Sequence, residues 1–353
     1  MDWPVLMVFF FGGLAVLLLL GLPVAFSFML INVIGIYVFW GGLIGLEQLI
    51  LSIDSSISTF VLVPVPMFIL MGTVIFHSGI AYRMIDVLDE WLGQVVGRLA
   101  LLAIGAGSLF ATLTGVAMGS VAMLGSTLVP DMERRGYSKS MSIGPILASG
   151  SLAIMIPPSA LGVILASLGQ FSVGKLLVGI LLPGILLAVV YAAYIVIRCL
   201  IQPNLAPAYD VEPTPIWPRI NRTIHYVVPL VTIIVVVIGT IFFGIATPTE
   251  AAALGALFCF LLVAIYGKLN WEVVKKSVAA ATSISVMVFI ILTGSTAFSQ
   301  ILAFTGITVG ITELALTWSE HPIFILLAMQ LILLLLGMFV EQTSIVMITT
   351  PMY

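Results

Sequence analysis

The chain has 353 residues, of which 61% are apolar and only 8% charged, and its formal net charge is −3. Soluble domains carry about 25% charged residues, so this composition excludes a water-facing globular surface and indicates a protein of the lipid bilayer. We therefore expect the bilayer as its surroundings and no nucleic-acid partner.

Apolar runs of about twenty residues, the length that crosses a bilayer as a helix, recur along the whole chain. They are residues 4–20, 24–40, 60–76, 176–200, 226–243, 251–266, 278–293 and 323–338. No basic stretch precedes the first run, which predicts a retained first span instead of a cleaved signal peptide. The sequence therefore predicts an all-α, polytopic helical bundle in a membrane.

The cations indicate how the chain is oriented. The first cation is Arg83, so the N-terminus and the first two connections lack the positive charge of cytoplasmic segments. We therefore predict a multi-pass protein of the bacterial inner membrane with a periplasmic N-terminus. Residues 99–130 are apolar but lie between two cytoplasmic groups of cations, which predicts a re-entrant hairpin. Residues 140–168 then cross outward, and every cation except Lys175 falls on the cytoplasmic side.

The order of elements repeats with inverted orientation. In the first half, the span 60–76 is followed by an amphipathic stretch at 79–98, predicted to lie along the membrane surface, and then by the hairpin. In the second half, a span at 278–293 precedes a weaker amphipathic stretch and an apolar hairpin. Residues 115–130 and 337–351 both run from a glycine to a proline. This order predicts two inverted repeats of the kind found in secondary transporters, with chance similarity between apolar segments as the alternative.

The predicted organisation has five parts. They are N-terminal scaffold helices at 1–59; a first repeat at 60–200 with arm helix 79–98, re-entrant hairpin 99–130 and broken helix 140–168; a cytoplasmic linker at 201–225; scaffold helices at 226–277; and a second repeat at 278–353, expected to be incomplete at its C-terminal end.

A double proline lies in the middle of one predicted crossing. Pro157 and Pro158 lack N–H groups and clash with the carbonyls four residues back, so they predict a break that leaves carbonyls free. Free carbonyls at membrane depth can bind a sodium ion, and the half-helix that begins near Ser159 can direct N–H groups at an anionic substrate. The hydroxyls of Ser149 and Ser151 come just before the break. A simple structural kink is the alternative.

The tip of the first hairpin offers glycines and hydroxyls. Gly115 and Gly119 allow close backbone approach, and Thr114 and Ser120 supply side-chain oxygens. A helix-packing face is the alternative interpretation of the glycine pair. Glu341 is the one acid expected inside an apolar hairpin. A charge buried in the membrane costs free energy, so it marks a functional position. The alternative is that Glu341 lies at the mouth of the hairpin, exposed to water.

The sequence argues against enzymatic classes. It contains neither a GxxxxGK[ST] phosphate loop nor an HExxH pair, and its three histidines are scattered among different loops. An intramembrane serine enzyme using Ser149, Ser151 or Ser159 is the remaining enzymatic alternative, but no histidine or lysine base falls in the same segment. We therefore expect no catalytic residues and no enzymatic activity.

Three strings resemble the large membrane subunit of the tripartite ATP-independent periplasmic (TRAP) transporters. They are IPPS at 156–159, PDMERRGYSK at 130–139 and ATPTEAAALGA at 246–256. The resemblance implies an elevator-type fold with scaffold and transport domains, and symport coupled to sodium ions (Na+). It also implies a small membrane (Q) subunit, a periplasmic substrate-binding protein (P subunit) and a small carboxylate substrate such as a dicarboxylate or sialic acid.

Site residues of the family carry over to matching positions. The implied sodium ligands are Thr114, Gly115, Ala153, Ile156, Pro157, Gly337 and Thr350, and the candidate substrate contacts are Ser120, Ser149, Ser151, Pro158, Ser159 and Thr349. The family commonly has a serine-glycine-serine-serine string at residues 114–117 and a glycine at Ala153, so this chain lacks two of those hydroxyls. The family also continues to a second proline-bearing break, so a chain that stops at Tyr353 is expected to be truncated, with half of the second site absent.

We therefore predict the permease subunit of a sodium-coupled secondary transporter that imports a small organic acid. The alternative is a docking or scaffold membrane subunit that moves no solute, which the missing C-terminal part favours. No arginine or lysine is expected at the midplane, so the residues do not encode which acid is carried.

Overall fold

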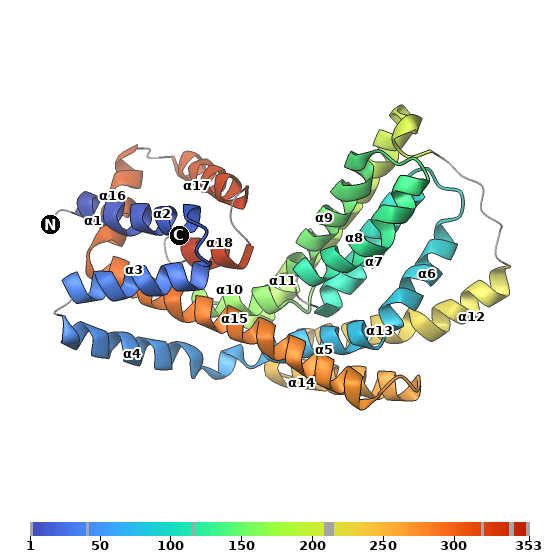
Figure 1. Cartoon of the computed structure of the whole chain (residues 1–353), viewed down its shortest axis with the longest axis horizontal. Helices are drawn as coiled ribbons and strands as arrows, with labels where there is room; N and C mark the ends of the chain where they lie inside the picture. The colour runs from blue at the N-terminus through green and yellow to red at the C-terminus, as the bar shows by residue number, and fades with distance from the viewer. Residues whose placement is uncertain are drawn as a thin grey trace. The chain divides into compact units, whose positions relative to one another are not determined.

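A computed structural model describes residues 3–39, 42–114, 117–207, 215–318, 321–338 and 342–350 of the chain (Figure 1). These described residues form helices joined by short turns, with no β-strand among them. Four of the helices are long and apolar enough to cross a membrane, and two bent pairs of helices pass the same test. The predicted all-α, polytopic membrane fold is confirmed.

The chain divides into two compact units, which we describe separately. The first comprises Met1–Phe60, Leu168–Gln170 and Ser285–Tyr353, and the second comprises Val61–Ser167 and Phe171–Ile284. The helices of the first unit are α1 (Trp3–Met7), the π-helical η1 (Val8–Gly12), α2 (Gly13–Leu19), α3 (Val24–Phe39), α4 (Leu43–Ile57), the C-terminal part of α15 (Trp271–Phe304), α16 (Ile307–Trp318), α17 (Pro322–Gly337) and α18 (Gln342–Thr349).

Aromatic side chains form the core of the first unit. Phe10, Phe28 and Phe298 are buried and come from η1, α3 and α15. The rings of Phe28 and Phe298 meet edge to face with centroids 5.3 Å apart, and those of Phe10 and Phe298 lie 6.1 Å apart. Each such pair contributes about 0.5–1.5 kcal/mol beyond the burial of its surface. The cluster therefore ties the N-terminal helices to α15.

The second unit contains the first predicted hairpin and the broken helix. Its helices are the 3-10 turn η2 (Phe60–Leu62), α5 (Pro64–His77), α6 (Ile80–Leu92), α7 (Arg98–Thr114), α8 (Ala117–Arg134), α9 (Lys139–Met155), α10 (Ala160–Leu168), α11 (Val173–Ile201), the 3-10 turn η3 (Pro203–Leu205), α12 (Ile216–Tyr226), α13 (Val228–Phe242), α14 (Pro248–Ile265) and the first part of α15. Helices α7, α8 and α9 pack side by side, and α5 packs along α14 (Figure 1).

The string PDMERRGYSK forms the turn between α8 and α9. Gly136 has a φ of 79° and its N–H donates to the carbonyl of Glu133, while the N–H of Tyr137 donates to the carbonyl of Met132. These two bonds satisfy the last carbonyls of α8, and only glycine adopts this left-handed conformation without strain. Ser138 then caps α9 by accepting from the N–H of Met141 at 3.4 Å. The string is therefore a structural connector.

The string ATPTEAAALGA forms the start of α14. Thr247 accepts from the N–H of Glu250, and the Glu250 carboxylate accepts from the N–H of Thr247 at 2.8 Å. Pro248 follows the cap at the first helical position, where its missing N–H costs nothing. Such a reciprocal capping box fixes where a helix begins.

A buried ion pair joins the amphipathic helix α6 to the hairpin. Arg98 at the start of α7 donates to both carboxylate oxygens of Asp89, at 2.7 and 2.5 Å, and to the carbonyl of Gly93 at 3.1 Å. The Arg98 side chain is only 6% exposed. A buried guanidinium needs this complete set of acceptors because its desolvation is costly.

Two helices lie where the sequence predicted no apolar span. Helix α4 lies where no span was predicted, because Glu47 and Asp54 interrupt its apolar pattern; its buried Gly45, Leu49 and Ser52 nevertheless recur at helical spacing. Helix α12 lies inside the residues predicted as a linker, because its apolar residues are few and its hydropathy is low.

Candidate ion and substrate site

The predicted break is present in the second unit. Helix α9 ends at Met155 and α10 begins at Ala160, and the two helices are bent by 51° relative to each other. Ile156 between them is extended, with φ −106° and ψ 113°. Pro157 and Pro158 follow and are both buried. The double proline therefore interrupts the helix as its covalent chemistry requires.

The break removes two donors from the helix. In a continuous helix the carbonyls of Ala153 and Ile154 would accept from the residues four positions later, which are Pro157 and Pro158 and have no N–H. Ala153 is fully buried. Buried carbonyls without a helical partner are strong acceptors for a donor or a cation. Three of the predicted sodium ligands, Ala153, Ile156 and Pro157, thus lie at the same short segment.

Helix α11 packs closely against this segment. A Cβ at Gly184 of α11 would lie 2.5 Å from the carbonyl oxygen of Met155 and 2.9 Å from Cγ1 of Ile156. No real side chain fits at such distances, so glycine allows α11 to approach the backbone at the break. On the same side Pro157 and Pro158 line an apolar recess with no room for a water molecule. The break is therefore held firmly on this face.

The α7–α8 hairpin packs against the other part of α9. Gly107 of α7 lies directly against Ser149 of α9, and a Cβ at Gly107 would overlap the Ser149 side chain. A Cβ at Gly150 of α9 would lie 2.6 Å from Cγ2 of Val121 and 3.6 Å from Cβ of Ala117, the first residue of α8. These contacts bring the start of α8 beside the last two turns of α9.

The serines predicted as substrate contacts lie in this region and already bond to helix backbone. Ser120, Ser149 and Ser159 are fully buried, and Ser151 is half-buried. The bonds are from Ser120 to the carbonyl of Ala117 (2.9 Å), from Ser149 to that of Ile146 (2.7 Å), from Ser151 to that of Ala148 (2.7 Å), and from the N–H of Gly162 to Ser159 (3.1 Å). Each hydroxyl oxygen keeps a lone pair for a cation or a donor.

One further residue belongs to this group. Tyr191 of α11 places its hydroxyl 3.2 Å from the Ser151 hydroxyl. Nothing in the sequence pattern of this long apolar helix singles out Tyr191, because its relation to Ser151 depends on tertiary packing. No histidine or lysine is bonded to Ser149, Ser151 or Ser159 in the contacts of the described chain, so the serines have no base beside them there.

The second predicted group lies in the first unit. Gly337 ends α17, and Thr349 ends α18 with its hydroxyl donating to the carbonyl of Ile345 at 2.8 Å. Thr350 follows and its N–H donates to the carbonyl of Val346. Helices α17 and α18, which lie where the second hairpin was predicted, pack on each other.

Two buried polar groups that the sequence analysis missed contact this region. Ser295 of α15 donates to the carbonyl of Met347 in α18. Asn32 of α3, fully buried, donates to the carbonyl of Gly294 at 2.6 Å, and its side-chain oxygen has no partner in the described residues. An asparagine within an apolar helix is visible in the sequence, and it indicates a polar contact because a buried polar side chain needs a hydrogen-bond partner.

Some predicted site residues lie outside the described structure. Gly115, Glu341 and Pro351 are not among the described residues, and of Thr114 only the backbone, at the end of α7, is described. Their predicted roles therefore stay predictions. In the part of the chain that the structure describes, no cluster of histidine, cysteine, aspartate and glutamate has the composition to hold a metal ion.

A helical hairpin packed beside a broken apolar helix is the arrangement that secondary transporters use to bind solute and ion. The fold and the site therefore place the chain in the class of secondary transporters. Residues 11–353 match the family described as the tripartite ATP-independent periplasmic transporter, DctM component, and the chain belongs to this family. The resemblance predicted from its motifs is confirmed.

The chain is similar to several TRAP large permease proteins. It is 30% identical to the C4-dicarboxylate protein DctM of Rhodobacter capsulatus, over 97% of this chain and 79% of that one. It is 29% identical to the ectoine protein TeaC of Halomonas elongata, over 96% and 78%, and 28% identical to the sialic acid protein SiaM of Vibrio cholerae, over 97% and 78%. It is accordingly a TRAP large permease protein and a polytopic protein of the bacterial inner membrane.

A solved structure shares the fold at low sequence identity. The YdaH transporter of Alcanivorax borkumensis superposes with a TM-score of 0.59 over 88% of this chain and 72% of that chain, at 14% identity. This likeness supports the transporter architecture and carries nothing about substrate.

Proposed function

We propose that the chain is the permease subunit of a sodium-coupled symporter that imports a small organic acid. The observation that carries this proposal is the α9–α10 break, where the carbonyls of Ala153 and Ile154 have no helical donors and the α7–α8 hairpin packs alongside. Unwound carbonyls of this kind coordinate Na+ in secondary transporters, and half-helix N-termini meet anionic substrate groups. Ser159, which caps α10, stands at such an N-terminus.

The names of the relatives support an organic-acid substrate. C4-dicarboxylates and sialic acid carry carboxylates, and ectoine, named for TeaC, carries one as well. We infer that a carboxylate meets helix ends and hydroxyls near the break, among them Ser149 and Ser151. We also infer a small membrane (Q) subunit and a periplasmic substrate-binding protein as partners, a periplasmic N-terminus, and an elevator-type movement of the hairpin and the break across the membrane.

The test is uptake of a panel of radiolabelled organic acids into proteoliposomes that hold the complete chain and its small membrane partner. The periplasmic binding protein is supplied outside, and each acid is measured with and without an inward sodium gradient. We expect uptake of at least one acid that requires both the binding protein and sodium. No uptake across the panel by verified, folded protein would favour a docking subunit that moves no solute.

Thr114 is proposed as the side-chain ligand of the first sodium ion. Replacing Thr114 with alanine is expected to raise the sodium concentration that gives half-maximal uptake, because one oxygen ligand is lost. Thr112, two residues earlier in α7, is the matched control, since its hydroxyl donates to the carbonyl of Ser108 at 2.6 Å within its own helix. Equal sodium dependence of the Thr114→Ala and Thr112→Ala variants would refute the ligand assignment.

A further inference from the structure

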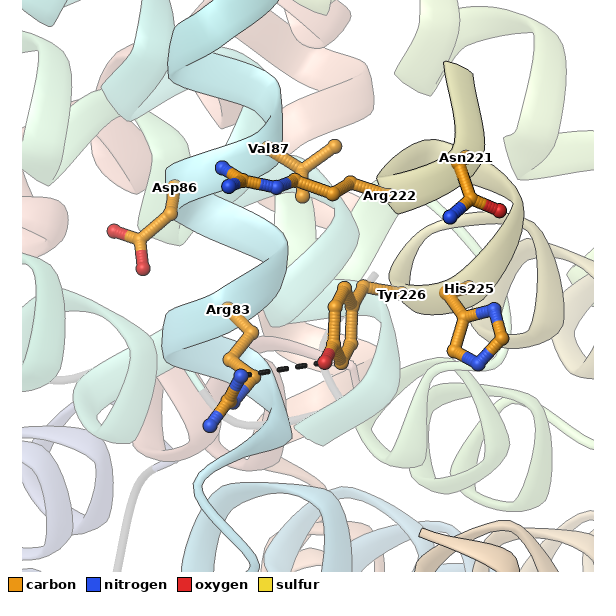
Figure 2. Close-up of a pocket in the computed structure, with 7 residues that line it drawn as sticks. All are labelled: Arg83, Asp86, Val87, Asn221, Arg222, His225 and Tyr226. Carbon is orange, nitrogen blue, oxygen red and sulfur yellow. Dashed lines mark hydrogen bonds between the residues drawn. The ribbon is translucent and has the colours of Figure 1, made fainter. Parts of the chain in front are cut away.

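A cavity of about 390 Å³ lies between α6 and α12, far along the chain from the proposed site. Figure 2 shows Arg83 of α6 facing Tyr226 of α12, with Arg222 of α12 also extending toward α6. The Arg83 guanidinium donates to the Tyr226 hydroxyl at 3.2 Å and lies 5.5 Å from the centre of its ring. The cavity is therefore walled by cationic and aromatic side chains.

A smaller cavity of about 160 Å³ shares Arg83 and Tyr226 and adds Lys268 and Tyr266. Arg222 is paired with the carboxylate of Glu90. Neither Arg83 nor Lys268 has a carboxylate within ion-pair distance among the described residues. The two cavities, which share Arg83 and Tyr226, thus present two exposed cations that form no ion pair in the described part of the chain.

Among the described residues, one carboxylate lines these cavities, that of Asp86. Asp86 lines the larger cavity on the side away from His225 (Figure 2). Desolvation raises the pKa of the Asp86 carboxyl above its usual value, and the nearby Asp89 and Glu90 carboxylates raise it further. The cavities are lined by three cations, Arg83, Arg222 and Lys268, against the one carboxylate of Asp86, so a negative ligand would meet net positive surroundings.

An apolar cleft of about 470 Å³ is lined by residues that lie next in the chain to residues of the cationic cavities. It lies between α13 and α14, and its lining is almost entirely apolar; the residues are Val228, Pro229, Thr232, Ile233, Val236, Phe258, Leu261, Leu262 and Ile265. Val228 follows Tyr226 closely in the chain, and Ile265 directly precedes Tyr266. The rings of Tyr226 and Tyr266 stack with centroids 5.8 Å apart, so the cavities and the cleft share one end of the helix pair.

This end has the composition of a membrane–water boundary. The apolar spans of α13 and α14 stop there, tyrosines occupy the boundary, and Arg219, Arg222 and Lys268 follow on the face that the cation distribution predicts to be cytoplasmic. Anionic lipids are concentrated in the cytoplasmic leaflet. A cationic pocket at this boundary can bind the headgroup of such a lipid, and the adjoining apolar cleft can bind its acyl chain.

We propose that this surface binds an anionic phospholipid, with its phosphate between Arg83 and Lys268 and an acyl chain in the α13–α14 cleft. Charge complementarity identifies the headgroup, since a zwitterionic lipid offers no net charge to Arg83 and Lys268. The apolar cleft indicates a lipid instead of free phosphate, because free phosphate has no apolar part that could occupy the cleft. Lipid bound here would bridge α6, α12, α13 and α14.

The test is native mass spectrometry of the purified complex of the chain with its small membrane partner, titrated with phosphatidylglycerol or phosphatidylcholine. The headgroup variant is the double replacement Arg83→Gln and Lys268→Gln. Each cation near a membrane surface contributes enough that losing two weakens binding by about thirtyfold. The control, Lys275→Gln with Lys276→Gln, removes two exposed cations of α15 that line neither cavity, and should bind phosphatidylglycerol like the wild type.

The cleft is tested separately by filling it. Val236→Trp places a large ring in the cleft, whereas Val235→Trp, at the neighbouring position with 60% exposure, does not line it. We expect phosphatidylglycerol binding to fall in Val236→Trp and to persist in Val235→Trp. Equal binding by the headgroup variant and its control would overturn the proposal. So would full displacement of the lipid by inorganic phosphate, or a cross-link from Val236→Cys to the small membrane partner in native membranes.

Discussion

Gly184 gives the sharpest test of how the break is held in place. An alanine there would bring its Cβ to 2.5 Å from the Met155 carbonyl oxygen and 2.8 Å from the Met155 carbonyl carbon. Those atoms belong to the backbone at the break and cannot rotate away as a flexible side chain would. Overpacking of this kind costs about 1–3 kcal/mol. The replacement also gains about 0.5–1 kcal/mol because alanine favours a helix more than glycine does.

Gly179 on the same helix isolates the packing cost. An added Cβ at Gly179 would meet nothing within 4 Å. Gly179→Ala therefore gains the helix preference without the clash, so the two variants should differ by about 1–3 kcal/mol in the free energy of unfolding. In domains of 150–250 residues each kcal/mol shifts the melting temperature by about 2–4 °C. We expect Gly184→Ala to melt below Gly179→Ala by that order.

The assay is thermal unfolding of the purified complex in detergent, in sodium and in choline buffers of equal ionic strength. Sodium that binds only the folded state stabilises it by RT ln(1 + [L]/Kd). Because Gly184 contacts the break, Gly184→Ala is also expected to raise the Kd for sodium and so to reduce this extra stability. Gly179→Ala should keep it. Equal melting temperatures for the two variants would refute the close approach of α11 to the break.

Three further predictions concern the hairpin and α6. Gly107→Ala should destabilise the chain by about 1–3 kcal/mol because the new Cβ would overlap α9, whereas Gly105→Ala, with nothing within 4 Å, should not; thermal unfolding distinguishes them. Asp89→Ala should destabilise the fold by about 3–5 kcal/mol because the buried Arg98 guanidinium loses its carboxylate partner, and an unchanged melting temperature would contradict this. Because the pKa of Asp86 is raised in the folded protein, protonation of Asp86 stabilises the fold. This contribution to stability is fully present below the usual pKa of 3.8 and is lost as pH rises through the raised pKa. Melting profiles against pH should therefore flatten in Asp86→Asn, and a profile identical to wild type would count against the shift.

The break was predictable because it rests on local chemistry. Pro157 and Pro158 cannot complete a helix wherever they occur in one, and the structure ends α9 at Met155. The turn at Gly136 and the cap at Thr247 follow in the same way from residues whose backbone preferences are strong. Such features need no knowledge of distant contacts.

Features that depend on packing were beyond the sequence pattern. Tyr191 meets Ser151 only because α11 crosses α9, and nothing local marks it. Helix α12, which lies almost wholly in the residues predicted as a cytoplasmic linker, packs on α6, where Trp91 donates to Thr223 at 2.7 Å. The spacing of apolar residues can predict that a segment is helical. It does not predict which other helix an amphipathic surface helix packs against, because that depends on the tertiary structure.

The most direct test of the central claim is uptake driven by sodium alone. Proteoliposomes containing the complete chain and its small membrane partner, with loaded binding protein outside, are given an inward sodium gradient at zero membrane potential, and in parallel an inward proton gradient without sodium. The account predicts accumulation of an organic acid above its outside concentration only with the sodium gradient, and a higher half-maximal sodium concentration in Thr114→Ala. Accumulation that is equal with the proton gradient and independent of sodium would contradict it.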